Sequence, residues 1–372
     1  MSEMMLNDTS VDSIKVKYLH GRPGAHYTHA NFAKHVNADF EFIDFKYRWH
    51  DQKKSIFYII YSWFYCAKNY TNRKLYDIFL VDGVHFSPII MKYLFLKRKK
   101  QKVVVYLGSH TMYFLYAKKF SRLNVALHKW VLNSYDAIIC EGEMAKFFVT
   151  SILKNPKPLI YTVFNGIPVA QNLSGSTRKI SIGKKLLFIG SYNNAFRFEY
   201  KGIDIMLKAF DIAFKKDNEL QFTLVGHPHE ALLNPILESM DPAARKALTF
   251  IEYTDKLEEL VFDHNIYLHC SRGDNFPTTV LIALSAGMPA IVNELNGTRE
   301  VVAKVNSGLL TTQDPSNIAE RISWYVNLSD EEKEKIMNDS REISKEYTEE
   351  KTVNKFTSVF TKLKSEIFEF RK

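Results

Sequence analysis

A loop that joins an apolar run to a helix carries the clearest chemical signal in this chain. Residues 265–270 have the composition of a buried strand, and the polar residues after them include the acid Asp274. A helix is predicted to begin at Thr278 and to end at a Gly-Met-Pro run, residues 287–289, because glycine and proline stop helices. The N–H groups at a helix N-terminus suit a phosphate, and a carboxylate accepts hydrogen bonds from sugar hydroxyls. This pattern predicts a polar-ligand site at the carboxyl edge of an open α/β sheet.

A second group of candidate ligand-binding residues follows the strand expected at 185–190. A loop leads from that strand to Lys201 and Gly202, and Arg197 lies within the loop. The sequence after Gly202 places apolar residues on one helical face, so a core-facing helix is predicted to open there. Lysine and arginine beside a helix N-terminus could bind a diphosphate. A surface lysine alone is common, but one that precedes Asp274 within the same predicted domain supports a shared site.

Short β-runs alternate with helical patterns along the chain, which is typical of parallel sheets with crossover helices. The predicted strands are residues 14–19, 40–44, 77–82, 103–107, 136–140, 159–164, 185–190, 221–226, 248–252, 265–270 and 289–292. The polar segment 170–184 has the composition of a linker. We therefore predict an α/β protein of two doubly wound domains, residues 1–170 and 171–354, with a ligand cleft between them. A C-terminal helix, residues 355–372, is expected to pack back on the first domain.

Length and composition favour a large soluble enzyme. The 372 residues are enough for two domains, and 46% of them are hydrophobic, as in ordinary globular proteins. The three cysteines are odd in number and far apart, so the sequence predicts neither a disulfide framework nor a metal cluster and favours a reducing compartment. The first residues lack the features of a secretory signal. We therefore expect a cytoplasmic protein.

The first half of the chain has features of a membrane-facing surface. Its most apolar run, Ser55–Ala67, has about 13 residues where a spanning helix needs about 20, so it is either a buried helix or an aromatic face at a membrane interface. Residues 1–170 hold 24 Lys and Arg against 12 Asp and Glu, whereas residues 171–372 hold 26 against 29. No nucleic-acid-binding module is recognisable, so we expect no nucleic-acid partner. An anionic membrane surface or a lipid-phosphate substrate explains the basic run 97–102 better, with a solvated loop as the alternative.

Taken together, these motifs resemble the donor site of family-4 glycosyltransferases, which have the GT-B fold of two Rossmann-like domains. Residues 271–292 follow the family's order of Ser, acid, Asn-Phe-Pro and Gly-x-Pro, and Gly190 with Lys201-Gly202 matches the opening of its second domain. Further matches in the family's order are Phe164–Pro168, Val225-Gly226, Asn296–Glu300, Asn306–Leu310 and Asp314-Pro315. The resemblance covers most of the chain. It implies a retaining, metal-independent hexosyltransferase that uses a nucleotide-sugar such as UDP- or GDP-hexose as substrate and needs no other cofactor.

The resemblance also implies roles for individual residues. Asp274 would contact the donor sugar, and His110, in a turn after the strand at 103–107, resembles the family's active-site histidine, with His85 as a competitor. The expected catalytic residues are therefore His110 and Asp274, and Gly24 would let the first strand–helix loop approach the donor. The expected donor-binding residues are Lys201, Gly202, Arg197, Gly190, Ser191, Asn275, Phe276, Pro277, Thr278, Thr279 and Gly24. Three further histidines are expected to be structural or exposed to solvent: His227, His229 and His269.

Two positions depart from the family's pattern. Ser191 stands where the family has an arginine, and Arg197 could supply the missing guanidinium. Ile282 stands where the family has a second acid that takes the ribose hydroxyls. Either another group holds the ribose, or affinity for the nucleotide is reduced, or activity has been lost. Loss of a charged hydrogen bond costs about 1.5–3 kcal/mol, which would weaken binding without abolishing it.

The sequence thus predicts a glycosyltransferase that moves a hexose from a nucleotide-sugar to a glycan or lipid-linked acceptor. The expected setting is the cytoplasmic face of the cell membrane, in the synthesis of cell-surface polysaccharide or glycolipid. The alternative from another class is a catalytically silent GT-B subunit that acts as a scaffold or binding partner of an active glycosyltransferase. A nucleotide-sugar epimerase on a similar fold is disfavoured, because the Lys-Gly and Asn-Phe-Pro elements belong to the transferases.

Overall fold

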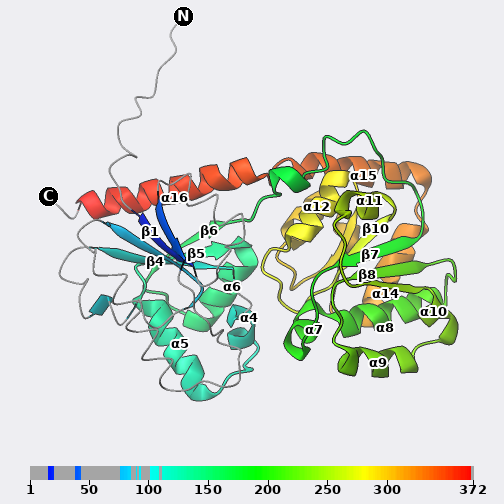
Figure 1. The fold of residues 1–372 in the computed structure, drawn as a ribbon, viewed down its shortest axis with the longest axis horizontal. Helices are drawn as coiled ribbons and strands as arrows, with labels where there is room; N and C mark the ends of the chain where they lie inside the picture. The colour runs from blue at the N-terminus through cyan, green and yellow to red at the C-terminus, as the bar shows by residue number, and fades with distance from the viewer. Residues whose placement is uncertain are drawn as a thin grey trace, which may run out of the picture. The chain divides into compact units, whose positions relative to one another are not determined.

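The computed structural model describes residues 16–20, 38–42, 76–84, 89, 92–93, 101–108 and 111–369. The chain divides into two compact units, and Figure 1 shows the elements of each. The first unit comprises Met1–Glu141, Ala145–Val163 and Thr352–Lys372, and the second comprises Gly142–Met144 and Phe164–Lys351. The chain passes into the second unit at Phe164, a few residues before the boundary predicted at residue 170.

A parallel six-stranded sheet in the order β2-β1-β3-β4-β5-β6 forms the centre of the first unit. Its strands are β1 (Val16–His20), β2 (Ala38–Phe42), β3 (Ile78–Asp82), β4 (Lys102–Leu107), β5 (Ala137–Glu141) and β6 (Leu159–Val163). The central strands are almost entirely apolar because a parallel sheet is covered on both faces. All six strands confirm the sequence prediction to within two residues at each end.

Helices flank the first sheet. They include α4 (Thr111–Tyr116), α5 (Arg122–Ser134), α6 (Gly142–Leu153) and α16 (Glu349–Glu369). The hydroxyl of Ser121 caps α5 by accepting a hydrogen bond from the backbone N–H of Asn124. The long C-terminal helix α16 packs one apolar face against strands β1, β3, β4, β5 and β6. The buried side chains on that face are Val353, Phe356, Val359, Phe360 and Leu363.

The second unit also contains a parallel six-stranded sheet, in the order β12-β11-β10-β7-β8-β9. Its strands are β7 (Lys185–Ile189), β8 (Gln221–Val225), β9 (Leu248–Ile251), β10 (Ile266–His269), β11 (Ala290–Asn293) and β12 (Leu310–Thr311). The first five confirm the predicted strands. β12 was not predicted, because two residues are too few to form a hydrophobic pattern.

Nine α-helices are described wholly within the second unit. They are α7 (Ala195–Lys201), α8 (Ile203–Phe214), α9 (Glu230–Ser239), α10 (Pro242–Lys246), α11 (Leu257–Phe262), α12 (Thr278–Ala286), α13 (Arg299–Val305), α14 (Pro315–Val326) and α15 (Asp330–Ser344). α8 packs against α14, and α12 packs against α15 (Figure 1). Across the described parts of both units, we find no helix with the length and apolar character that crossing a bilayer requires.

We expect the docking of α16 to contribute to the stability of the first unit. Phe356 is almost fully buried and its ring meets that of Tyr106 on β4, with the ring centroids 6.1 Å apart. Phe356→Ala should lower the free energy of unfolding by about 3–5 kcal/mol, because it leaves a cavity in the core. Lys355→Ala, on the exposed side of the same helix, is the matched control. Equal denaturation midpoints for the two variants would contradict this packing.

Candidate functional site

The carboxyl ends of β7 and β10 form the point where the strand order of the second sheet reverses. β7 has β8 on one side and β10 on the other: the chain runs from β7 to β8 and β9 and then crosses back to β10, β11 and β12 on the other side of β7. In open α/β sheets, ligands bind outside the strand ends at such a switch point. The hydroxyl oxygen of Tyr267 on β10 lies 3.2 Å from both the backbone nitrogen and the carbonyl oxygen of Ile189, the last residue of β7. This contact ties the two strand ends together.

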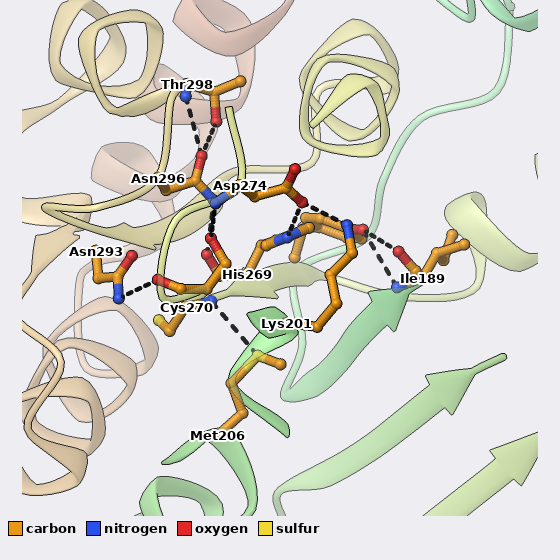
Figure 2. Close-up of polar contacts among 11 residues, drawn as sticks. Ile189, Lys201, Met206, His269, Cys270, Asp274, Asn293, Asn296 and Thr298 are labelled. Carbon is orange, nitrogen blue, oxygen red and sulfur yellow. Dashed lines mark hydrogen bonds and ion pairs between the residues drawn. The ribbon is translucent and has the colours of Figure 1, made fainter. Parts of the chain in front are cut away.

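Three side chains meet above this strand pair (Figure 2). Lys201 comes from the last turn of α7, Asp274 from the loop after β10, and His269 from the end of β10 itself. The Lys201 ammonium forms an ion pair with Oδ2 of Asp274, and Nε2 of His269 lies 3.1 Å from the same oxygen. The lysine and aspartate side chains remain 20% and 14% exposed, so a ligand can reach both. Oδ1 of Asp274 has no hydrogen bond to the residues that the structure describes.

The two contacts keep Asp274 ionised. Burial alone would raise the pKa of this carboxyl group, because it disfavours the charged form. The charge of Lys201 and the hydrogen bond from His269 outweigh that effect and hold the pKa well below its usual range. The site therefore presents a carboxylate rather than a carboxylic acid at neutral pH.

His269 is the partner of Asp274 that the sequence did not reveal. The imidazole is fully buried, and burial lowers its pKa; Asp274 opposes this shift, while the charge of Lys201 adds to it. The ring is therefore neutral, and its Nε2–H donates to the carboxylate. Nδ1 has no hydrogen-bond partner among the described residues. The expectation that His269 is structural or exposed did not include this contact with Asp274, and its place at the carboxyl end of a strand before an acidic loop was the available signal.

The connection around Lys201 differs from the prediction. The segment expected to be a loop contains helix α7, capped by Asn194, whose Oδ1 accepts a hydrogen bond from the backbone N–H of Arg197. Lys201 therefore ends a helix instead of opening one. Gly202 then takes a left-handed conformation with φ 69°, and a Cβ there would collide with the carbonyl oxygen of Cys270. Glycine is required at this turn, which brings Lys201 against the end of β10.

Arg272 fastens α7 to the loop that carries the acid. Its guanidinium donates two hydrogen bonds to the Asp204 carboxylate, at 2.7 and 2.6 Å, and one to the carbonyl oxygen of Glu199 at 2.8 Å. Its backbone N–H donates to the carbonyl oxygen of Tyr200. A two-pronged charged contact of this kind fixes orientation as well as distance. It fixes the position of α7, which carries Lys201, relative to the loop that carries Asp274.

A set of fully buried polar residues at the end of β11 and just after it supports the acidic loop (Figure 2). The side-chain amide of Asn293 donates to the carbonyl oxygen of Ser271 at 2.8 Å, and that of Asn296 donates to the carbonyl oxygen of His269 at 2.9 Å. Oδ1 of Asn296 accepts from both the N–H and the hydroxyl of Thr298. Gly297 donates its N–H to the carbonyl oxygen of Asp274, and a Cβ there would collide with the loop. The Asn-Gly-Thr motif thus holds the loop in place.

The predicted residues after β7 also lie at this edge. A Cβ on Gly190 would stand 3.8 Å from Cε of Lys201, so the two residues are neighbours. Ser191 is half-buried. A Cβ placed on Gly226 would stand 3.3 Å from the Cα of Ser191, so these two residues are also neighbours. Gly226 itself has φ 140° and lies against the carbonyl oxygen of Gly190. Two glycines therefore allow the ends of β7 and β8 to approach closely beside the lysine.

The remaining predicted donor residues form the start of α12. Thr278 and Thr279 are half-buried in its first turn, and Pro277 precedes them as the N-cap residue. Asn275 is buried. Phe276 is buried in the core of the second unit, where its ring lies near Phe164 and Tyr347, with centroid distances of 6.0 and 6.1 Å.

Ile282 and Arg197 bear on the two departures from the family's pattern. Ile282 is almost fully buried in the core on α12, and it offers no hydrogen-bonding side chain. Arg197 lies on α7, one helical turn before Lys201, and is half-buried. Within the described ranges, no three His, Cys, Asp or Glu side chains are grouped as a metal site would need.

Three predicted residues of the first half, His110, its competitor His85, and Gly24, lie outside the described residues.

Two other histidines of the second unit lie away from the Asp274 carboxylate. His227 faces the exposed Glu252, with Nδ1 3.4 Å from a carboxylate oxygen, and His229 precedes α9.

The ionisation of His269 provides a test of this geometry. Since Asp274 raises the pKa of the imidazole and Lys201 lowers it, Asp274→Asn should lower this pKa further and Lys201→Met should raise it. An NMR titration of the ring in the two variants would measure both shifts. Shifts of the same sign, or no shift in either variant, would contradict the three-residue contact.

Comparisons with known proteins agree with this architecture. Residues 183–327 match the family described as Glycosyl transferases group 1. The chain is 24% identical over 241 residues to an uncharacterized glycosyltransferase of Methanocaldococcus jannaschii, covering 63% of this chain and 62% of that protein. It is 26% identical over 174 residues to an uncharacterized glycosyltransferase of Haemophilus influenzae, covering 44% and 46%. The match thus spans less than two thirds of the length of either relative.

Solved structures resemble nearly the whole chain. HepE from Anabaena, in a crystal structure with UDP-glucose, has a TM-score of 0.70 at 14% identity and covers 94% of this chain and 100% of that one. Sucrose-phosphate synthase from Thermosynechococcus elongatus has a TM-score of 0.68 at 13% identity, covering 95% and 99%. The chain therefore has the GT-B fold, and its residues 183–327 are similar to the family described as Glycosyl transferases group 1.

Proposed function

We propose that this protein is a glycosyltransferase that moves a hexose from a nucleotide-sugar to a glycan or lipid-linked acceptor. The observation that carries the proposal is the pairing of Lys201 with Asp274 at the switch point of a group 1 glycosyltransferase domain. A cation and a carboxylate at one strand edge suit a ligand that carries both a diphosphate and sugar hydroxyls. HepE, which has the same fold, binds UDP-glucose in its crystal structure.

In the proposed reaction, Lys201 stabilises the leaving group. The bond from the anomeric carbon to the diphosphate oxygen breaks, and negative charge develops on that oxygen as the bond to the acceptor oxygen forms. The acceptor hydroxyl gives its proton to that departing diphosphate oxygen in the same process. An ammonium group in a partly buried site stabilises such charge more strongly than it would in water. Arg197, on the same helix, is proposed to add to this positive field.

Asp274 has a different proposed role. Its carboxylate is ionised, and Oδ1 is available to accept hydrogen bonds from the donor sugar. It therefore orients the ring and stabilises positive charge near the anomeric carbon, while His110 is proposed to contact the same sugar. We propose retention of configuration, as the resemblance implies. We also propose that Lys201 provides the positive charge at the diphosphate that a metal ion provides in other transferases.

The alternative of a catalytically silent subunit rests on Ile282 and Ser191. Ile282 removes one expected acceptor for the ribose hydroxyls, which would weaken nucleotide binding by the amount of a charged hydrogen bond. The lysine, the aspartate and the residues that orient them are nevertheless all present and in contact. We therefore favour an active enzyme whose ribose is held by another group.

We further propose that the protein acts at the cytoplasmic face of the cell membrane, in the synthesis of surface polysaccharide or glycolipid. The excess of basic residues in residues 1–170 supports this setting. The aromatic segment Ser55–Ala67 and the basic residues 97–100 lie outside the described residues.

The role of Lys201 predicts a loss of nucleotide affinity. Lys201→Met should weaken binding of the better of UDP and GDP by about tenfold to a hundredfold, as expected for loss of a charged hydrogen bond. Calorimetric titration with both nucleotides would measure this, with Lys208→Met on the exposed side of α8 as the matched control. If Lys201→Met binds as tightly as the control, the lysine does not contact the diphosphate.

The role of Asp274 predicts a loss of turnover instead. Asp274→Asn should reduce sugar transfer severely, while binding of the free nucleoside diphosphate stays nearly intact, because the carboxylate acts on the sugar. Hydrolysis and transfer from a panel of nucleotide-sugars, with acceptor extracts, would be compared with calorimetry on the same samples. Equal losses in both measurements would mean that the residue only shapes the loop.

A further inference from the structure

Helix α5 of the first unit exposes apolar side chains to solvent. Leu123, Leu127 and Trp130 are 69%, 39% and 45% exposed. Their spacing of four and three residues places them in one stripe along the helix. The opposite side of the helix packs on the unit, with His128 and Leu132 buried. The solvent side of this helix is therefore apolar where a polar face would be expected.

An aromatic contact fixes the Trp130 ring at one end of the stripe. The ring of Tyr93 stacks on that of Trp130, with centroids 6.1 Å apart and an interplanar angle of 16°. Tyr93 is itself exposed. Tyrosine and tryptophan with one apolar side and one polar group favour the boundary between water and lipid. The composition of this face thus resembles that of a surface which enters a membrane interface.

Basic residues predominate in the sequence around α5. Residues 83–135 contain ten lysines and arginines and no aspartate or glutamate. Of these, Lys92 forms an ion pair with Asp136, which follows this segment. Arg122 and Lys129 lie on α5, each directly beside a residue of the apolar stripe, and Lys118 is exposed in the turn before the helix. Neither Arg122 nor Lys129 forms an ion pair with an acid of the described chain. A partner with negative charge would therefore complement this face.

We propose that this face of α5 docks on an anionic lipid bilayer. Leu123, Leu127 and Trp130 enter the interface, and Arg122 and Lys129 remain at the level of the lipid phosphates. A helix that is apolar on one face and basic beside it binds lipid surfaces in this way. A second copy of the chain fits less well, because a twofold contact would bring the two basic stripes together without an acid between them. The proposal rests on α5 alone and not on sugar transfer.

Vesicle flotation of the full chain tests the proposal. Wild type should bind vesicles that contain phosphatidylglycerol, fail to bind vesicles of phosphatidylcholine alone, and dissociate as salt rises. The double variant Arg122→Gln, Lys129→Gln should bind at least about tenfold more weakly, since each basic residue near an anionic surface contributes about fivefold. The double variant Leu123→Gln, Trp130→Gln should also bind more weakly by about tenfold, because apolar burial is lost.

The matched control changes the same residue types on the second unit. Leu232→Gln, Lys335→Gln removes an exposed leucine and an exposed lysine from α9 and α15 and should leave vesicle binding unchanged. UDP and GDP affinity, measured in each α5 variant, should equal that of wild type. This readout separates the two proposals, because nucleotide binding can fail while vesicle binding by α5 remains.

A spectroscopic readout locates the contact on α5. Anionic vesicles should shift the tryptophan emission of wild type to shorter wavelength, and Trp130→Phe, which keeps an aromatic ring there, should bind vesicles but lose much of that shift. Vesicle binding by the α5 double variants equal to wild type would overturn the proposal, as would an emission shift unchanged by Trp130→Phe. Lipid-independent dimerisation that these variants abolish would instead assign the face to a second copy.

Discussion

Two opposite charges, on Lys201 and Asp274, are held largely out of water at one edge of the second sheet, and much of the surrounding structure serves to keep them together. Burying a charge is costly unless a partner and further hydrogen bonds compensate for lost hydration. Here the charged and hydrogen-bonding groups come from two chain segments. α7 supplies the lysine, and the end of β10 with the loop after it supplies His269 and the acid. Because Lys201 and Asp274 are 73 residues apart in sequence, the pair can form only in the folded second unit.

The need to hold Lys201 and Asp274 together also explains the glycines and buried asparagines around them. Gly202 lets the α7–α8 turn approach Cys270, and Gly297 lets the chain after β11 pass under the acidic loop. Buried asparagines then hold this loop through its backbone. A substitution at either glycine would move a charged side chain without touching it. Close backbone approach and satisfied buried polar groups are therefore parts of the same requirement.

Much of this arrangement could be predicted from sequence. Apolar runs bounded by polar residues located eleven strands, and the Gly-Met-Pro stop located the end of α12, because burial and helix termination leave local patterns. α7 was missed, since a short helix rich in aromatic residues has no clear periodicity. His269 was missed for another reason. Its significance depends on the distance to Asp274, which is set by the turn of the loop after β10 rather than by any local pattern.

The charge pair also constrains how a ligand can be bound. In the proposed reaction the diphosphate competes with Asp274 for the lysine, so part of the ion pair must be given up when the donor arrives. A carboxylate left alone in a partly buried site would then be strongly destabilised. His269 would limit this cost, because its Nε2–H can still donate a hydrogen bond to Oδ2 when Lys201 turns toward the phosphate. A protonated imidazole would retain the carboxylate more strongly but would place a second buried cation beside the lysine. A buried, neutral histidine therefore suits a site in which the lysine changes partner and the aspartate remains charged.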